Sequence, residues 1–448
     1  MKNILLALFS GLFLAFSWPD LGYTAIIFFA FVPLLIIEKE SSDLKQVFLC
    51  SFFCFLIFNV ITTYWVWNST PIGSVVAFFV NSLLMAATFT IYSAIKRSNN
   101  NYSSNITFIV CWLTFEYLHL NWDLSWPWLT IGNVFAKDPQ IIQWYEYTGV
   151  LGGSLWVLLI NTIIFDLVFL KNKKRIFHLL FFLIVPILTS LYVYHKNFEI
   201  KSNYKLNILI VQPNIDPYTE KFNIGYKDQL NEFVELSKKY LNDEIDLLIG
   251  PETALQEDIW ENRINSTFSI KTFRELQTQY PNLNILVGAS TYKLFEKNEE
   301  KSSTARQIRG EDIFYDAYNS AIYISSKGNV EIYHKTKLVP GAEKMPFPKI
   351  LDFLSELMLD LGGISGSLGS SNNIEHFELD NLRIKPLICY ESVYGDINNG
   401  DTDLIAIITN DGWWGNTLGY RQHLNYSRLR AIEQRKSIVR AANTGISA

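Results

Sequence analysis

Three side chains capable of chemistry stand at or just beyond short, β-branched apolar runs that predict buried strands: Glu252, Lys335 and Cys389. A cysteine at a sheet edge becomes nucleophilic when a base takes its proton or a cation stabilises its thiolate. A glutamate within hydrogen-bond reach would serve as that base, and a lysine would stabilise the thiolate or a tetrahedral oxyanion. Each residue type alone is more often structural, so the prediction depends on the three together.

The cysteines of the chain are few. Cys389 is the only cysteine after residue 205, so it has no disulfide partner in that half and is a candidate reactive thiol. The others lie inside apolar runs, where a small buried side chain is the simpler interpretation: Cys50, Cys54 and Cys111. His334 and His423 are the plausible partners for a cysteine–histidine enzyme, but their spacing nominates neither. No glycine-rich phosphate loop or paired zinc-ligand motif appears, so we expect no metal and no cofactor.

Short strand signals alternate with helical patterns over residues 205–448, which predicts a layered α/β domain. The expected strands are 206–211, 246–249, 284–288, 320–325, 330–333, 383–388, 403–409 and 437–441. The expected helices are 226–242, 267–280 and 419–436. Leu424, Leu429 and Ile432 predict that the last helix is amphipathic, with one buried face.

Residues 1–198 form a series of long apolar runs, which predicts a transmembrane helical domain of about seven spans. The candidate spans are 3–17, 22–38, 46–67, 71–95, 105–119, 148–170 and 177–195. The chain carries a formal net charge of −5 and shows no basic stripe, which excludes nucleic-acid binding as an expected function.

Positive charges are divided unevenly between the loops that join these spans. One set of loops, with the N-terminus, carries Lys2, Lys39, Lys45, Lys96, Arg97, Lys171, Lys173, Lys174 and Arg175. The opposite short loops carry only Lys137. The positive-inside rule therefore predicts a cytoplasmic N-terminus, and seven spans place the domain 205–448 outside the cytoplasm.

Two features of the membrane half admit alternatives. Glu116 lies within or at the end of a span, where a carboxylate faces a cavity or partner, or else simply sits at the interface. The aromatic loop 125–128 is expected to anchor the chain at the membrane interface.

Several segments together resemble the nitrilase superfamily, and more closely the bacterial apolipoprotein N-acyltransferases. In the membrane half the matching segments are Ala15–Pro19, Tyr64–Val66, Phe115–Leu118 and Trp126–Leu129. In the other half they are Pro251–Thr253, His334–Lys335, Leu338–Pro340, Ile388–Glu391, Asn410–Gly415 and Ala442–Ile446. The resemblance covers essentially the whole chain and implies a multi-pass α-helical membrane bundle plus an αββα sandwich.

The resemblance also implies roles for individual residues. Glu252 would be the general base, Lys335 the oxyanion-stabilising cation and Cys389 the nucleophile. The supporting residues would be Glu343, Tyr390, Glu391, Trp413 and Trp414. The tryptophans and the loop 341–347 would shield a thioester from water and admit lipid, or else would only pack the domain.

The family's reaction implies the partners. A phospholipid, typically phosphatidylethanolamine, gives an acyl chain to the cysteine, and the N-terminal diacylglyceryl-cysteine of an apolipoprotein then takes it. We therefore expect a monomer in the bacterial inner membrane with its catalytic domain facing the periplasm.

Two departures from the family pattern stand out. Gly341-Ala342-Glu343 replaces the usual Phe-Gly-Glu, and the sequence stops at Ala448 where the family continues, so we expect a C-terminal truncation.

Two other classes of protein remain as alternatives. One is a membrane-tethered nitrilase-like amidase for small carbon–nitrogen substrates. The other is a non-catalytic transporter or scaffold, against which the complete triad and the few charges in the spans argue.

Overall fold

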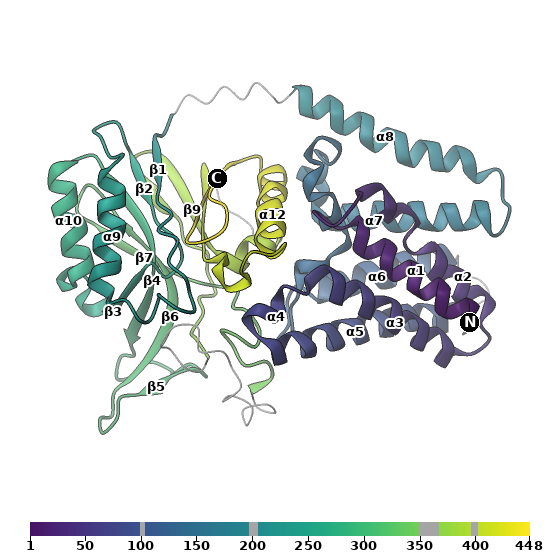
Figure 1. The fold of residues 1–448 in the computed structure, drawn as a ribbon, viewed down its shortest axis with the longest axis horizontal. Helices are drawn as coiled ribbons and strands as arrows, with labels where there is room; N and C mark the ends of the chain where they lie inside the picture. The colour runs from purple at the N-terminus through teal and green to yellow at the C-terminus, as the bar shows by residue number, and fades with distance from the viewer. Residues whose placement is uncertain (99–103, 197–204, 349–366, 396–401) are drawn as a thin grey trace. The chain divides into compact units, whose positions relative to one another are not determined.

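A computed structural model of the chain describes residues 1–98, 104–196, 205–348, 367–395 and 402–448. Its residues form two compact units (Figure 1), and the first comprises Met1–Ile200 with Thr417–Arg435. The second comprises Lys201–Asn416 with Lys436–Ala448. The predicted boundary at 198–205 lies mostly outside the described residues. The expected domain 205–448 differs in one element, because residues 417–435 belong to the first unit.

The first unit is built mainly from apolar helices. They are α1 (Lys2–Ser17), α2 (Val32–Glu40), α3 (Leu44–Thr63), α4 (Val66–Ser69), α5 (Pro71–Ser98), α6 (Ser104–Leu118), α7 (Tyr145–Val168) and α8 (Arg175–Lys196). Among the described residues, α3, α5, α7 and α8 are long and apolar enough to cross a membrane. α1 and α6 are shorter apolar helices. Six of the predicted spans therefore coincide with helices.

The predicted span 22–38 is wrong as a single helix. A 3₁₀ segment, Thr24–Phe29, is followed by the short α2. Pro33 lies in the first turn of α2, where its fixed φ and missing N–H favour a helix start. Asn161 of α7 provides partners for backbone groups at the break between these two segments. Its side-chain amide accepts from Phe31 N at 2.8 Å and donates to the Ile27 carbonyl at 2.9 Å.

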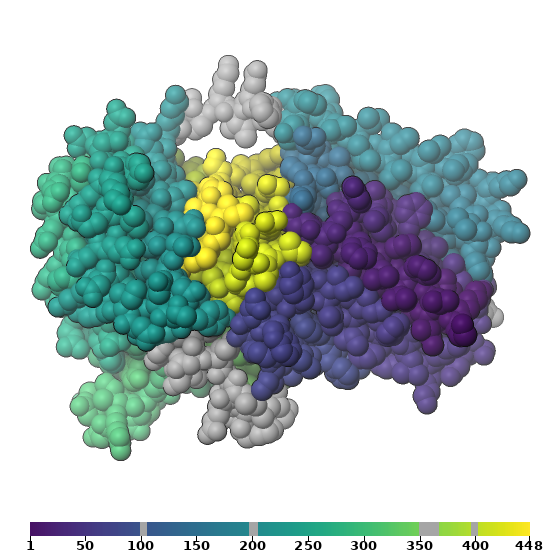
Figure 2. All heavy atoms as spheres, viewed as in Figure 1, coloured from purple at the N-terminus to yellow at the C-terminus, as the bar shows by residue number. Residues whose placement is uncertain are grey.

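The outer surface of the helices is apolar. The helices α1 to α5 run from purple to blue in Figure 2. Large apolar side chains are exposed on several helices, among them Phe9, Phe53, Phe79, Ile91, Val110 and Phe181. Extensive exposed apolar surface of this kind is typical of contact with lipid.

Charged side chains link the helix ends at one end of the first unit. Lys2 Nζ lies 2.6 Å from Glu40 Oε1, which joins the start of α1 to the end of α2. Arg97 Nη1 donates to the Ser42 carbonyl at 2.6 Å, which adds the end of α5. Several of the segments whose positive charges the sequence placed on one side of a membrane therefore meet at one end.

Helix α12 (Gly419–Gln434) lies at the other end of the first unit, among the loops that follow α1 and α3. Gln422 Oε1 accepts from the indoles of Trp65 at 3.2 Å and Trp128 at 2.9 Å. The Tyr426 hydroxyl accepts from Trp18 Nε1 at 3.1 Å and donates to the Trp128 carbonyl at 2.8 Å. These polar contacts explain why α12 belongs to this unit.

The prediction of an amphipathic α12 is wrong. Leu429 and Ile432 are buried as expected, but the polar Gln422, His423 and Asn425 are buried too. Buried polar groups need hydrogen-bond partners, and the first unit supplies them for Gln422.

Glu116 and Trp128 of the aromatic loop 125–128 are buried inside this unit. Glu116 is 4% exposed, and its Oε1 accepts from Trp112 Nε1 at 3.0 Å and Ile131 N at 2.8 Å. The carboxylate therefore has internal partners and is not interfacial. Trp128 is 1% exposed, so this ring packs inside the unit, while anchoring by the rest of the loop stays a prediction.

The second unit contains two β-sheets. The first sheet consists of β1 (Ile208–Ile210), β2 (Leu247–Ile249), β3 (Leu255–Trp260), β4 (Asn284–Leu294), β5 (Arg306–Gln307), β6 (Phe314–Ile324) and β7 (Val330–His334). Its central order is β1-β2-β4-β6-β5, with β3 beside β4 and β7 beside β6. The second sheet has the order β11-β10-β9-β8, from β8 (Phe377–Leu379), β9 (Leu382–Ile388), β10 (Leu404–Thr409) and β11 (Ser437–Ala442).

The two sheets share a hydrophobic core. Leu286 and Tyr323 of the first sheet cluster with Ile388 and Ile408 of the second. On the opposite face of the first sheet, α9 (Tyr226–Lys238) and α10 (Phe268–Gln279) cover a second core. Such packing fixes the strand ends of both sheets, and the side chains that follow them, relative to one another.

Candidate active site

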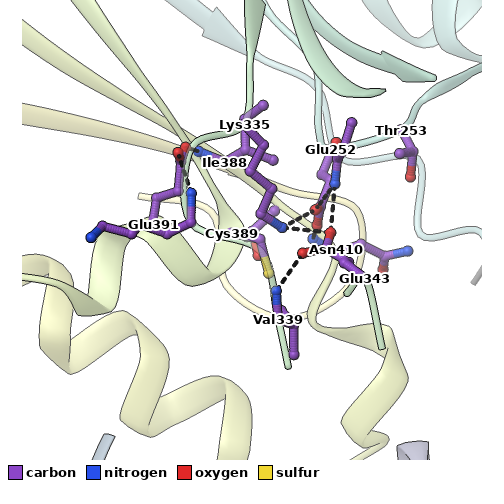
Figure 3. A network of polar contacts seen from close by, with 12 residues as sticks. Glu252, Thr253, Lys335, Val339, Glu343, Ile388, Cys389, Glu391 and Asn410 are labelled. Carbon is purple, nitrogen blue, oxygen red and sulfur yellow. Dashed lines mark hydrogen bonds and ion pairs between the residues drawn. The ribbon is translucent and has the colours of Figure 1, made fainter. Parts of the chain in front are cut away.

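Four strand ends of the second unit bring polar side chains together (Figure 3). Glu252 follows β2 and Lys335 follows β7 in the first sheet. Cys389 follows β9, and Asn410 follows β10, in the second sheet. The structure therefore places the three residues of the predicted triad in one cluster.

The Lys335 ammonium lies between two carboxylates. Its Nζ is 2.7 Å from Glu343 Oε1 and 3.3 Å from Glu252 Oε1. Lys335 is 1% exposed, so the charge is removed from water. Burial acts to lower the pKa of Lys335, but the carboxylates of Glu343 and Glu252 outweigh it and raise the pKa above its usual value. Lys335 is therefore a fixed cation at neutral pH.

Neighbouring amides fix the orientation of both carboxylates. The Asn319 side-chain amide donates to Glu252 Oε1 at 2.8 Å and to Glu343 Oε1 at 3.0 Å. The backbone N–H of Asn410 donates to Glu252 Oε2 at 3.0 Å, and that of Val339 donates to Glu343 Oε2 at 2.8 Å. Each carboxylate thus uses both of its oxygens and is held in one orientation.

Cys389 occupies a strained turn directly after β9. Its φ is 50°, in the left-handed region that non-glycine residues seldom adopt. Figure 3 shows its sulfur beside the Lys335 ammonium. Burial raises the pKa of the thiol and the Glu252 carboxylate raises it further, while Lys335 opposes both. The resting group is a neutral thiol, so attack on a carbonyl requires a base.

Glu391 stabilises the turn that carries the thiol. Its Oε2 accepts from the Ile388 backbone N–H at 2.7 Å. Its Oε1 accepts from the Tyr333 hydroxyl, the Thr336 backbone N–H and the Thr336 hydroxyl, each at 2.7 Å. Because Glu391 is fully buried, these bonds tie the end of β9 to the end of β7. Glu391 therefore positions Cys389 relative to Lys335.

The remaining predicted residues lie close along the chain but make other contacts. Tyr390 is buried and packs edge-on against Tyr394, with ring centroids 5.2 Å apart. Trp413 packs edge-on against Tyr218 at 5.4 Å, and its carbonyl accepts from the Tyr218 hydroxyl at 2.8 Å. Trp414 is partly buried in the same 3₁₀ turn.

Asn319 and Gly288 contribute to the site but were not predicted. Asparagine is uncommon inside strands, so Asn319 in the apolar β6 was a signal of a buried polar contact. Gly288 in β4 lies against the turn that carries Glu252. A Cβ at Gly288 would meet Glu252 Cα and the Pro251 carbonyl oxygen at 2.6 Å, so only glycine fits without a shift of the turn. Nothing in the sequence alone pairs Gly288 with Glu252.

Comparison with known families defines the class of protein. A model described as the carbon-nitrogen hydrolase family matches residues 210–448. A model described as the apolipoprotein N-acyltransferase N-terminal domain matches residues 10–163. The chain thus combines a carbon-nitrogen hydrolase domain with a membrane domain of one particular kind.

Curated relatives narrow this class. An apolipoprotein N-acyltransferase of Chlorobaculum tepidum is 28% identical over 100% of this chain and 86% of its own length. One of Rickettsia typhi is 31% identical over 84% of this chain and 69% of its own length. The chain belongs to the apolipoprotein N-acyltransferase family, which confirms the resemblance and the predicted combination of membrane helices with a nitrilase-like domain. It is a membrane protein and an acyltransferase enzyme.

Proposed function

We propose that Cys389 is the nucleophile, Glu252 the general base and Lys335 the oxyanion-stabilising cation of lipoprotein N-acylation. The observation that carries this proposal is the buried Lys335 ammonium, held by two carboxylates beside a neutral thiol. A fixed cation in a water-poor site stabilises developing negative charge more strongly than one in water. Glu343 holds the ammonium in place, and Glu391 positions the thiol.

The first half-reaction forms a thioester. The Cys389 sulfur attacks the ester carbonyl of a phospholipid while Glu252 takes the thiol proton. The tetrahedral oxyanion lies against Lys335. Its collapse breaks the acyl carbon–oxygen bond, and Glu252 returns the proton to the leaving glycerol oxygen, which releases a lysophospholipid.

The second half-reaction transfers the acyl chain to an amine. The α-amino group of an N-terminal diacylglyceryl-cysteine attacks the thioester carbonyl and gives a proton to Glu252. The carbon–sulfur bond breaks, and that proton passes to the Cys389 sulfur. The products are an N-acylated lipoprotein and the free thiol.

The acyl donor in this proposal is phosphatidylethanolamine and the acting species is a monomer. Trp413 and Trp414 shield the thioester, because a partly exposed aromatic surface beside the site excludes water and accommodates acyl chains. The competing role for these two rings is packing of the domain alone. Unchanged thioester lifetime after replacement of both tryptophans would decide for packing.

The catalytic domain faces the periplasm of the inner membrane in this proposal. Support comes from the lysine-rich segments, which meet at one end of the helical unit through contacts such as Lys2–Glu40. The loops at the other end bind α12, which follows β10 and precedes β11 in the chain. The lysine-rich end is cytoplasmic, and the end that holds α12 is periplasmic.

One experiment tests the chemistry. The protein in detergent is incubated with phosphatidylethanolamine that carries a labelled acyl chain, and the label on Cys389 is located by peptide mass spectrometry. A diacylated lipopeptide is then added. We expect label on the Cys389 peptide and its transfer to the lipopeptide amine, and no label in Cys389→Ala. An unlabelled wild-type protein, or a labelled Cys389→Ala variant, would overturn the assignment. Hydrolysis of small amides without lipid turnover would favour an amidase.

A further inference from the structure

A second buried lysine lies beside the site, outside the triad. Lys221 is 5% exposed and lies in the loop between β1 and α9. Its Nζ donates to the Thr253 hydroxyl at 2.5 Å. Thr253 directly follows Glu252, so this bond reaches the turn that carries the proposed base.

The Thr253 backbone is strained, and contacts with other side chains must stabilise it. Its φ is 46°, in the left-handed region, which is costly for a β-branched residue. Its carbonyl accepts from the Gln256 side-chain amide, and its hydroxyl accepts from Lys221. A conformation of this kind persists only where the surroundings over-determine it.

Other contacts keep Lys221 itself in place. Its backbone N–H donates to the Asp216 carbonyl at 2.9 Å, and its own carbonyl accepts from Gln229 Nε2 at 2.7 Å. Its ammonium lies 5.6 Å from the centroid of the Trp413 ring, within the range of a cation–π contact. One side chain thus connects the 216–222 loop, the Glu252 turn and the Trp413 turn.

We infer that Lys221 is a positioning residue for the acyl transfer. Its ammonium holds Thr253 in the strained conformation that aims the Glu252 carboxylate, and couples that turn to Trp413. This inference rests on the proposed role of Glu252 as the base. Lys221 does not touch the reacting atoms; it acts through Thr253 and through its charge near Glu252.

The charge of Lys221 is sensitive to mild alkali. Burial lowers the pKa of Lys221 to about 8, although the Glu252 carboxylate acts to raise it. Among the described residues, Glu252 is the charged group that shifts this pKa. The two acidic residues of its own loop bind backbone N–H groups. Asp216 Oδ1 accepts from the Thr219 N–H at 2.7 Å, and Glu220 Oε2 accepts from the Asp216 N–H at 2.8 Å. Loss of the proton therefore removes the attraction to Glu252 and the contact with Trp413.

The test measures single-turnover formation of the Cys389 acyl-enzyme across pH in wild type, Lys221→Met, Lys221→Arg and Thr253→Val. We expect the wild-type rate to fall above about pH 8, and Lys221→Met to be at least about tenfold slower with this alkaline fall lost. Lys221→Arg keeps its charge, so its fall moves to higher pH. The double variant Lys221→Met/Thr253→Val is expected to be no slower than the slower single variant, because both changes remove one bond.

The control is Lys227→Met, which removes an exposed lysine of the neighbouring helix α9. Its rate and pH profile should equal those of wild type. A wild-type protein that forms no acyl-enzyme would overturn the proposed function. A wild type that acylates, together with a Lys221→Met variant of unchanged rate and pH profile, would overturn the role of Lys221 alone. A slower Lys221→Met that keeps the alkaline fall and is additive with Thr253→Val would also overturn it.

Discussion

At the scale of single residues, the site balances two buried carboxylates with one buried cation beside a thiol. Glu252 and Glu343 flank one buried cation, Lys335, and the thiol beside them has a raised pKa. In the proposed mechanism, a neutral thiol does not repel the Glu252 base, and the Lys335 charge remains available for the oxyanion that forms later. The same arrangement predicts how the thiol responds when the cation is removed.

Lys335→Met should make Cys389 less reactive toward a small alkylating reagent at fixed pH. Lys335 is the cation that lowers the pKa of the thiol, so its loss raises that pKa and reduces the thiolate fraction. We expect alkylation of the Cys389 peptide to slow by about tenfold or more, since the thiolate is the reactive form. Mass spectrometry of that peptide measures the rate. Lys327→Met, in an exposed ion pair with Asp380, is the control and should change nothing.

Glu391→Gln should weaken both the stability of the second unit and acyl transfer. The change replaces one carboxylate oxygen of Glu391, which accepts hydrogen bonds, with an NH₂ group. That NH₂ group would face a donor such as the Ile388 N–H. We expect the free energy of unfolding to fall by about 1–3 kcal/mol, the cost of an unsatisfied buried donor. Thermal unfolding and the acylation rate measure the two effects. Glu378→Gln, on an exposed position of β8, is the control, and equal losses in both variants would contradict the special role of Glu391.

At the scale of elements, the sequence predicted most of what positions the site. Each expected strand and helix of residues 205–448 is present, because β-branched runs and helical periodicity report local preferences. β3 was not expected, because Leu255–Trp260 lacks a continuous apolar run and becomes a strand only by pairing with β4. The strand ends led to the three residues of the proposed triad. Asn319 and Lys221 act through contacts between distant segments, which no local sequence pattern records.

The helix α12 also depends on contacts between distant segments that its local sequence does not record. Its sequence identified a helix and two of its buried apolar residues correctly, but its polar residues were assigned to solvent. Gln422 is buried because three groups of the first unit bind it: Trp65, Trp128 and the Thr62 carbonyl. Partners so far apart in sequence are visible only in the folded chain.

Gln422→Leu should therefore destabilise the helical unit. The change removes three buried hydrogen bonds of Gln422, with the Trp65 and Trp128 indole N–H groups and with the Thr62 carbonyl. We expect a loss of about 2–4 kcal/mol, because more than one buried group loses its bond at the same time. Thermal unfolding in detergent, followed by tryptophan fluorescence, measures it. Arg421→Ala removes an exposed neighbour on α12 and should leave the transition unchanged; a matching shift in that control would contradict the argument.

At the scale of the whole molecule, the sidedness of the chain decides which lipids and proteins reach Cys389. The lysine-rich ends of the helices and the end that binds α12 are opposite ends of one helical unit. Positive charges tend to remain on the cytoplasmic side during membrane insertion, and in the proposed orientation a few lysines orient the entire chain. An acceptor with a free N-terminal amine outside the cytoplasm would then meet the thiol on the correct side.

Single cysteines introduced on the two sides test this sidedness. In a variant whose four native cysteines are replaced by alanine, Lys297→Cys places a thiol in the β4–β5 loop of the catalytic domain, and Lys173→Cys places one in the loop before α8. Both positions are exposed. A membrane-impermeant maleimide added to intact spheroplasts should label Lys297→Cys at once and Lys173→Cys only after permeabilisation. The opposite pattern would place the catalytic domain in the cytoplasm. Equal labelling of both would mean that the lysine asymmetry does not fix one orientation, because chains of both orientations would then be present in the membrane.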